Sequence, residues 1–340
     1  MPCGDSRLVK GSLFIALLFC ISSVFAQDIR TDISVHDPVM TKAGDTYYLF
    51  GTGRGINVWS SKDRISWKQE PPVFAAGPQW AVDAVKGFKD FIWAPDIHHA
   101  NGQYYLYYCV STFGKNNSAI GVATNKTLDP GSVDYKWTDQ GMILQSIPGK
   151  TNWNAIDPNV VIDDKNNAWL FFGSFWEGLK MVQLNSDLLG VSAGNLAKIE
   201  TIASYRGDKN KIAESDELRA NAIEAPFIFK RSGYYYLFAS IGYCCRGSKS
   251  TYRMIVGRSK TATGPYIDAE GKPMATGGGT LVLQGDADWY GVGHNSAYTF
   301  EGKDYLVFHG YDPRDNAKPK LRMEQLYWRK GWPLIKPKQN

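Results

Sequence analysis

Three acidic residues lie one or two positions before a proline at the start of a short apolar run. They are Asp37 in "VHDPVM", Asp157 in "NAIDPNVV" and Glu224 in "NAIEAPFIF". Two carboxyl groups with different pKa values can serve as general acid and general base. Hydrolysis of a glycosidic bond requires such a pair on opposite sides of the bond that is cleaved. The three acids are therefore candidate catalytic residues, provided that the fold brings them together.

A fourth acid, Asp96, occurs in a variant of this phrase, "WAPDIHH". An acid at this point can also have a purely structural role, because its carboxylate can accept hydrogen bonds from backbone N–H groups and close a turn. For Asp96 we favour this structural role. For Asp37, Asp157 and Glu224 we favour chemistry, because three carboxylates brought to one place repel each other and such a cost is seldom kept without a use.

The phrase occurs five times at intervals of roughly 60 to 70 residues, and the fifth copy, "GHNSAYTF", has His294-Asn295 where the others have an acid. Each copy is followed by a polar turn such as "KAGD", "ANGQ", "KRSG" or "EGKD", and then by an aromatic run such as "YYLF" or "YYLYY". Turns of this kind are typical of hairpins, and aromatic runs are typical of strands. Most units contain a third apolar run, and no long amphipathic helix is evident.

Five antiparallel units of this length predict an all-β fold, a five-bladed β-propeller. A solenoid is less favoured, because its repeats are usually shorter. The first strand of each blade lines the central axis of a propeller. Acids at the same place in successive units should therefore converge at one end of that axis.

The 340 residues are 44% hydrophobic and carry a net charge of +5. No dense run of Lys or Arg is present, so nucleic acid is not an expected partner. We also expect the protein to be a monomer. Residues 1–26 resemble a cleaved signal peptide, with a basic start and a short apolar core, which predicts a secreted or periplasmic protein. Lipoprotein anchoring at Cys20 is the alternative. Residues 27–340 would then form a single propeller domain, with no membrane span.

The phrases "HDP", "WAPD", "NAIDPNV", "EAPFI" and "GHN" resemble those of glycoside hydrolase family 43. Within that family, "GSFW" (173–176) and "CCRGSKSTYRMIVGRS" (244–259) resemble the arabinanases, which cut α-1,5-linked L-arabinofuranose chains. The resemblance covers roughly residues 30 to 330. It implies a five-bladed propeller, in agreement with the repeats.

The resemblance also implies roles. Asp37 matches the general base that activates a water molecule, Glu224 matches the general acid, and Asp157 matches the acid that orients Glu224 and raises its pKa while itself ionised. His294 matches a residue that helps to hold a central cation such as Ca²⁺, largely through water, and no organic cofactor is implied. The family inverts the anomeric configuration, which implies carboxyl groups roughly 6.5–9.5 Å apart.

Residues that contact the sugar follow less directly from the resemblance. Trp93 and Phe113 match stacking platforms, although packing between blades would also explain them. Gly114 would allow the backbone to approach the sugar closely. The remaining matches, which contact arabinose units by hydrogen bonds or stacking, are Asn154, Ser174 and Trp176.

The sequence assigns no chemical role to the other histidines or to the cysteine pair. A structural role is favoured for His98, His99 and His309, and His36 needs no chemical role. Cys244 and Cys245 are either a vicinal disulfide or two small buried side chains.

The sequence thus predicts an inverting glycoside hydrolase that cleaves arabinan and arabino-oligosaccharides in endo mode. An exo-acting arabinanase, or an arabinofuranosidase or xylosidase on the same scaffold, is the enzymatic alternative. A propeller that only binds carbohydrate is the non-enzymatic alternative; it would need stacking rings more than three acids.

Overall fold

The structure, a computed structural model, describes residues 1, 29–205 and 221–336. The predicted signal peptide from residue 2 onwards, including Cys20, lies outside the described residues. No helix in the described ranges has both the length and the apolar character needed to cross a membrane.

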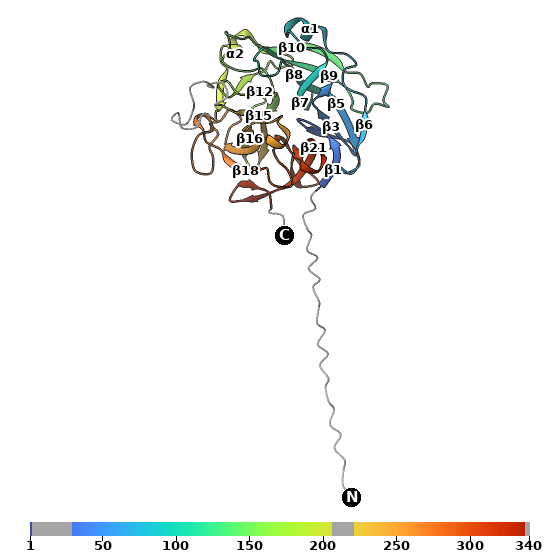
Figure 1. The fold of residues 1–340 in the computed structure, drawn as a ribbon, viewed down its shortest axis with the longest axis vertical. Coiled ribbons are helices and arrows are strands. Elements are labelled where there is room, and N and C mark those ends of the chain that lie inside the picture. The colour runs from blue at the N-terminus through green and yellow to red at the C-terminus, as the bar shows by residue number, and fades with distance from the viewer. Residues whose placement is uncertain (2–28, 206–220, 337–340) are drawn as a thin grey trace.

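Five antiparallel sheets are arranged around a central axis, which confirms the predicted five-bladed propeller (Figure 1). The first blade consists of β2 (Val39–Ala43), β3 (Thr46–Gly51), β5 (Asn57–Ser61) and β6 (Lys68–Glu70). The second consists of β7 (Phe91–Ala100), β8 (Gln103–Val110), β9 (Ser118–Asn125) and β10 (Thr138–Ser146), with the short β4 (Gly53–Arg54) paired to β7. The third consists of β11 (Asn159–Ile162), β12 (Ala168–Phe172), β13 (Leu179–Gln183) and β14 (Glu200–Ala203).

The last two blades have the same order. The fourth consists of β15 (Ile223–Arg231), β16 (Tyr234–Ile241), β17 (Arg253–Ser259) and β18 (Thr280–Gln284). The fifth consists of β19 (Val292–Phe300), β20 (Lys303–Asp312), β21 (Lys318–Arg329) and β1 (Ile29–Ser34), with β22 (Trp332–Leu334) also paired to β21. The helical elements are short and lie in connections: α1 (Gln79–Ala84), α2 (Ala193–Leu196), η2 (Gly247–Lys249), η3 (Met274–Thr276) and η4 (Pro313–Asp315).

The fifth blade takes its outer strand from the beginning of the chain. β1 is antiparallel to β21, with Ser34 opposite Lys320. This pairing closes the ring, because it joins the two ends of the described chain in one sheet (Figure 1). The repeat pattern alone did not predict it.

The hairpins between the first and second strands follow from their turn residues. Gly102, Gly233 and Gly302 have left-handed backbones, and so do the residues immediately before them. Two consecutive positive φ angles define the type I′ turn, whose twist matches that of the flanking strands. The turns predicted from "ANGQ", "KRSG" and "EGKD" are thus confirmed.

The hydrophobic core lies between neighbouring blades, where the faces of successive sheets pack together. Phe171 of the third blade, for example, packs in one cluster with Leu237 of the fourth, and both are fully buried. Similar clusters join the second blade to the third and the fifth to the first. This packing fixes the inner strands, whose first residues surround the axis.

Candidate active site

One residue at the axial end of each blade has a left-handed backbone. These five residues are Asp37 (φ 52°), Ala94 (φ 40°), Asp157 (φ 56°), Ala225 (φ 56°) and His294 (φ 51°). Four of them precede a proline, and His294 precedes Asn295. A positive φ in a non-glycine residue costs on the order of 1–3 kcal/mol and concentrates at functional sites. The recurring acid–proline phrase therefore marks a repeated backbone kink.

Relative to that kink, the four acids fall at three different positions. Asp37 and Asp157 occupy the kink itself, Glu224 precedes it by one residue, and Asp96 follows it by two. His294 occupies the kink of the fifth blade. The kinks therefore direct Asp37, Asp157 and His294 in the same way, whereas Glu224 reaches the site from the neighbouring position on β15.

Asp96 has the structural role that we favoured. Its Oδ2 accepts a hydrogen bond from the backbone N–H of Val160 in the next blade, at 2.7 Å. Burial raises the pKa of Asp96 to about 7, although the Val160 N–H acts against that rise. Asp96 thus joins the inner strands of two blades.

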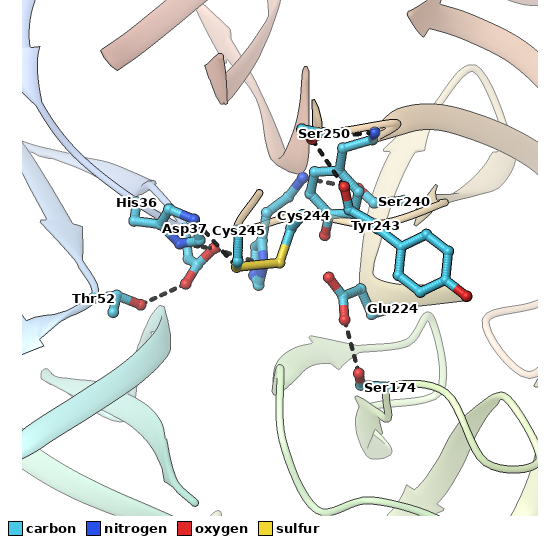
Figure 2. The surroundings of a disulfide bond; sticks show 12 residues. His36, Asp37, Thr52, Ser174, Glu224, Ser240, Tyr243, Cys244, Cys245 and Ser250 are labelled. Carbon is cyan, nitrogen blue, oxygen red and sulfur yellow. Dashed lines mark hydrogen bonds and ion pairs between the residues drawn. A yellow bond between two sulfur atoms is a disulfide. The ribbon is translucent and has the colours of Figure 1, made fainter. Parts of the chain in front are cut away.

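Asp37 is surrounded by hydrogen-bond donors. His294 Nδ1 lies 3.0 Å from its Oδ1. His36 Nδ1 lies 2.8 Å from the same oxygen, and Thr52 Oγ1 donates to Oδ2 at 2.5 Å (Figure 2). Burial by itself would raise the pKa of Asp37, but His294 and His36 outweigh it and hold that pKa well below its usual value. Asp37 is therefore an ionised carboxylate with fixed orientation, as a general base requires.

His294 is the positive partner in this cluster. Burial lowers the pKa of its imidazole, but the charges of Asp37 and Asp157 exceed that effect and raise the pKa to about 9. Its backbone N–H donates to Ser240 Oγ at 2.8 Å. The buried acids at the axis are thus partly neutralised by a protonated histidine.

Glu224 is buried and held by the "GSFW" segment. Ser174 Oγ donates to Glu224 Oε2 at 2.8 Å, and the backbones of these two residues form an isolated antiparallel bridge (Figure 2). Tyr252 lies nearby, and burial together with the charge of Glu224 raises the pKa of its hydroxyl.

The pKa of Asp157 is influenced by both of the other two acids. Its Oδ2 accepts the backbone N–H of Ala225, the residue after Glu224, at 3.1 Å. Burial raises the pKa of Asp157 to about 8, His294 opposes this, and the charges of Glu224 and Asp37 add to it. Burial thus favours the protonated form of Asp157 in the protein without substrate, whereas the sequence led us to expect an ionised carboxylate.

The residues predicted to contact sugar are placed in two different ways. Phe113 is 77% exposed in the loop between β8 and β9, and Gly114 beside it has φ 72° with open space around it. Trp93 in β7 is half-buried against the core between the second and third blades. Phe113 is thus free to stack on a ligand, whereas Trp93 also serves packing.

The other three predicted contacts already have protein partners. Asn154 is buried, and its Oδ1 accepts from Ser118 Oγ at 2.6 Å. Ser174 donates to Glu224, as described above. The carbonyl of Trp176 accepts from Asn221 Nδ2 at 3.0 Å.

Sequence reasoning missed several side chains around Asp37. His309 is fully buried, and its Nδ1 accepts the backbone N–H of Asp37 at 3.2 Å. Tyr311 Oη lies 3.1 Å from His36 Nε2. His309 and Tyr311 are two residues apart on β20, so they share one face of the strand. The alternation of His309 and Tyr311 in "FHGY" was the only sign in the sequence that they lie together, and it matches no known motif.

Two sets of residues bear on a metal ion. His36, Asp37 and His309 offer ligand atoms within 4.8 Å of one another, so this group could hold a metal ion. Two imidazoles and one carboxylate suit a borderline transition metal better than Ca²⁺, which prefers oxygen. The predicted residue, His294, instead lines a small axial cavity together with Asn295. Both amide atoms of Asn295 are buried without a hydrogen-bond partner in the described ranges, which leaves an oxygen donor available there.

The cysteine pair forms a disulfide, Cys244–Cys245, in the connection between β16 and β17. In Figure 2, Asp37 and Glu224 lie on either side of this disulfide. The remaining described cysteine, Cys109, is buried and free, and burial raises the pKa of its thiol.

A larger cavity of about 570 Å³ lies away from the axis, between the third blade and the connection from β17 to β18 of the fourth. It is lined by residues that include Trp169, Lys198, Glu200 and Tyr266. None of the buried acids described above lines it. We therefore place the candidate active site at the axis, where the perturbed carboxyl groups are.

Comparison with known proteins is consistent with this geometry. The sequence model of the family "Glycosyl hydrolases family 43" matches residues 31–333. An extracellular exo-alpha-(1->5)-L-arabinofuranosidase, ArbA of Cellvibrio japonicus, is 48% identical over 90% of this chain and 88% of its own length. The extracellular endo-alpha-(1->5)-L-arabinanase 1 of Bacillus subtilis is 39% identical over 88% of this chain and 87% of its own.

A solved structure gives the same result for the fold. The crystal structure of an exo-1,5-alpha-L-arabinanase from a bovine ruminal metagenomic library superposes with a TM-score of 0.85 and is 45% identical, covering 93% of this chain and 99% of that one.

Proposed function

The chain belongs to glycosyl hydrolases family 43 and is a glycoside hydrolase, and from this premise we propose that it hydrolyses α-1,5-linked L-arabinofuranose chains with inversion of configuration. The observation that carries the proposal is the cluster of Asp37, Asp157 and Glu224, which three different blades bring to one axial site. Family relatives named for this linkage support the choice of substrate.

In this proposal Asp37 is the general base. Its low pKa keeps it ionised over the whole physiological range, and His36, His294 and Thr52 fix the plane of its carboxylate. It would take a proton from the water molecule that attacks the anomeric carbon. General base catalysis of this kind typically contributes 10²- to 10⁴-fold to the rate.

Glu224 is the proposed general acid, which protonates the leaving oxygen. Ser174 holds one of its carboxylate oxygens, which leaves the other for the leaving group. Asp157 would serve as a proton reserve beside it, because its raised pKa keeps a proton within the same cluster of acids. We assign Asp157 the role of orienting the Glu224 segment through the Ala225 N–H.

The proposed sugar contacts are Trp93, Phe113, Gly114, Asn154, Ser174 and Trp176. The exposed ring of Phe113 and the open backbone at Gly114 give a ligand the most direct access. For the central ion we propose Ca²⁺, held largely through water near His294 and Asn295, with His294 neutral when the ion is bound. Bound there, the ion would add positive charge that stabilises the carboxylates around the axis.

We propose endo action, with exo action as a second candidate. The exo mode is favoured by one observation: the relatives at 48% and 45% identity are named as exo-acting, and the one at 39% as endo-acting. We also propose a monomer exported by way of a signal peptide at residues 1–26, in keeping with relatives described as extracellular.

Product analysis on linear α-1,5-arabinan tests the function and the mode together. Endo action gives a mixture of oligosaccharides at the earliest times, whereas exo action gives one small product from the start. Absence of cleavage, with cleavage of a xylo-oligosaccharide instead, would overturn the substrate assignment.

A further inference from the structure

A chain of hydrogen bonds runs from the disulfide to Asp37. The backbone N–H of Cys245 donates to Tyr311 Oη at 2.6 Å, and Tyr311 Oη lies 3.1 Å from His36 Nε2. His36 Nδ1 in turn lies 2.8 Å from Asp37 Oδ1. The chain links the connection between β16 and β17, the strand β20, and the kink before β2.

For a neutral His36, the chemistry of the two ends fixes the direction of every bond in this chain. An amide N–H can only donate, so Tyr311 Oη accepts from Cys245, and its own proton goes to a His36 Nε2 that carries none. Burial raises the pKa of Tyr311, so the phenol keeps that proton. At the other end an ionised carboxylate can only accept, so Nδ1 of His36 must carry the proton that faces Asp37. A neutral His36 is thereby held in its Nδ1–H tautomer.

The disulfide controls the first donor of the chain. The Cys245 amide belongs to the peptide bond between the two cysteines, which the disulfide closes into an eight-membered ring. Cys245 also has a left-handed backbone, with φ 61°, a conformation that a non-glycine residue adopts only when its surroundings hold it there. Cys245 is exposed at the surface of the site. Opening the ring would therefore release the N–H that anchors Tyr311.

We propose that Tyr311 and the Cys244–Cys245 ring are positioning residues: they set the tautomer and orientation of His36, and through it the carboxylate of Asp37. Neither needs to touch the substrate. The ring of His36 stacks on the buried ring of His309, with centroids 3.9 Å apart, and this contact holds the ring plane. The hydrogen bond from Tyr311 then determines which nitrogen of His36 carries the proton. The expected effect on kcat rests on the proposed function, whereas the expected tautomer of His36 does not.

The structural content is tested by nitrogen NMR of protein labelled with ¹⁵N-histidine, which requires no turnover. The chain has five histidines, and the His36→Asn variant identifies the His36 signals by their loss. We expect a pyrrole-type Nδ1 and a pyridine-type Nε2 for neutral His36. We expect that pattern to average or reverse in Tyr311→Phe and in a Cys244→Ser/Cys245→Ser variant. A wild-type His36 protonated on Nε2 would overturn the inference, whatever the enzyme cleaves.

The kinetic content is tested by a double-mutant cycle on linear arabinan. Loss of one buried hydrogen bond in such a chain corresponds to about a tenfold change. We expect Tyr311→Phe and the double Ser variant each to lower kcat about tenfold with KM within twofold. Because both act through one chain, combining them should cause no further loss. Additive losses, or a normal kcat in the double Ser variant, would refute the link between ring and tyrosine.

A control variant and a conservative substitution separate positioning from folding. Tyr235→Phe removes a hydroxyl that bonds to Asp164 on the neighbouring blade, and it should leave kcat unchanged. His36→Asn keeps an N–H at the position of Nδ1 and should retain more activity than His36→Gln, whose amide reaches only the position of Nε2. Equal losses in the Asn and Gln variants would contradict the proposal.

A dithiol reductant gives an independent route to the open ring. One molecule of dithiothreitol would supply two electrons and two protons, yielding two cysteine thiols and its own cyclic disulfide. Reduced wild-type protein should match the double Ser variant in kcat and in the His36 spectrum. An unaltered spectrum after complete reduction would overturn the role of the ring. If wild-type protein fails to cleave arabinan at all, the proposed function fails, while the spectra still decide this inference.

Discussion

His294 of the fifth blade and Asp37 of the first blade meet at the axis, with His294 Nδ1 3.0 Å from Asp37 Oδ1. Each stabilises the charged form of the other, because the pKa of Asp37 falls and that of His294 rises to about 9. This pair explains how a buried carboxylate can remain ionised beside Asp157 and Glu224. It also determines how the enzyme should respond to pH.

Replacement of His294 by Gln should raise the pKa of Asp37. The positive charge of His294 lowers that pKa, so its removal makes the base easier to protonate. The acid limb of the kcat/KM profile, which reports the base in the free enzyme, should therefore move to higher pH. A profile from pH 3 to pH 8 measures this. An acid limb that stays in place, or moves down, would show that Asp37 does not depend on His294.

Asp37→Ala and Glu224→Ala should each lower turnover on arabinan by about 10²- to 10⁴-fold, the usual contribution of a general acid or base. Because Asp37 carries a left-handed backbone, its variant is compared with wild type in thermal unfolding as well as in activity. Asp45→Ala, at a carboxylate 91% exposed, is the matched control and should remain fully active. Near-normal turnover by either axial variant would refute the assignment.

Asp96→Asn should change the pH dependence of stability. In the folded protein Asp96 has a pKa of about 7, above its unfolded value, so the folded state keeps a proton that the unfolded state loses. The stability of wild type therefore falls as pH rises from about 4 to about 7, by on the order of 4 kcal/mol from this group. Asn cannot ionise, and its oxygen can still accept the Val160 N–H.

Urea unfolding of wild type and Asp96→Asn at pH 4.5 and pH 8.5 measures the effect. The variant should gain stability relative to wild type at the higher pH. If the difference between the two proteins is the same at both pH values, Asp96 is ionised throughout and our description of its environment is wrong.

Calcium should stabilise the protein through the axial cavity. A ligand at 100 times its Kd stabilises the folded state by about 2.7 kcal/mol, which raises Tm. Protein treated with a chelator should therefore show a higher Tm when Ca²⁺ is restored, and Asn295→Ala should reduce that rise. An equal rise in wild type and variant would place the ion elsewhere, with the His36, Asp37 and His309 group as the next candidate.

Local signals account for what could be predicted from the sequence. Turns such as "ANGQ" and "KRSG" and the aromatic runs after them predicted the hairpins, and the repeated acid–proline phrase predicted five blades. The closing strand β1 could not be predicted this way, because its pairing with β21 joins segments about 290 residues apart. Nothing in the residues Ile29–Ser34 identifies that partner.

The site was predictable to the same extent. Asp37 and Glu224 stood out because proline and an apolar run accompany them. His36, His309 and Tyr311 did not, because their importance comes from contacts between the first and fifth blades that only the closed ring creates. The raised pKa of Asp157 could not be predicted either, since it depends on burial in the assembled axis.

Proton NMR of the first reducing ends released from linear α-1,5-arabinan shows directly whether Asp37 and Glu224 form an inverting acid–base pair. We predict β-configured products at the earliest times, which then mutarotate, and at most traces of product from Asp37→Ala over the same time. Products that first appear in the α configuration would mean retention, and with it a nucleophilic carboxylate that this account does not contain.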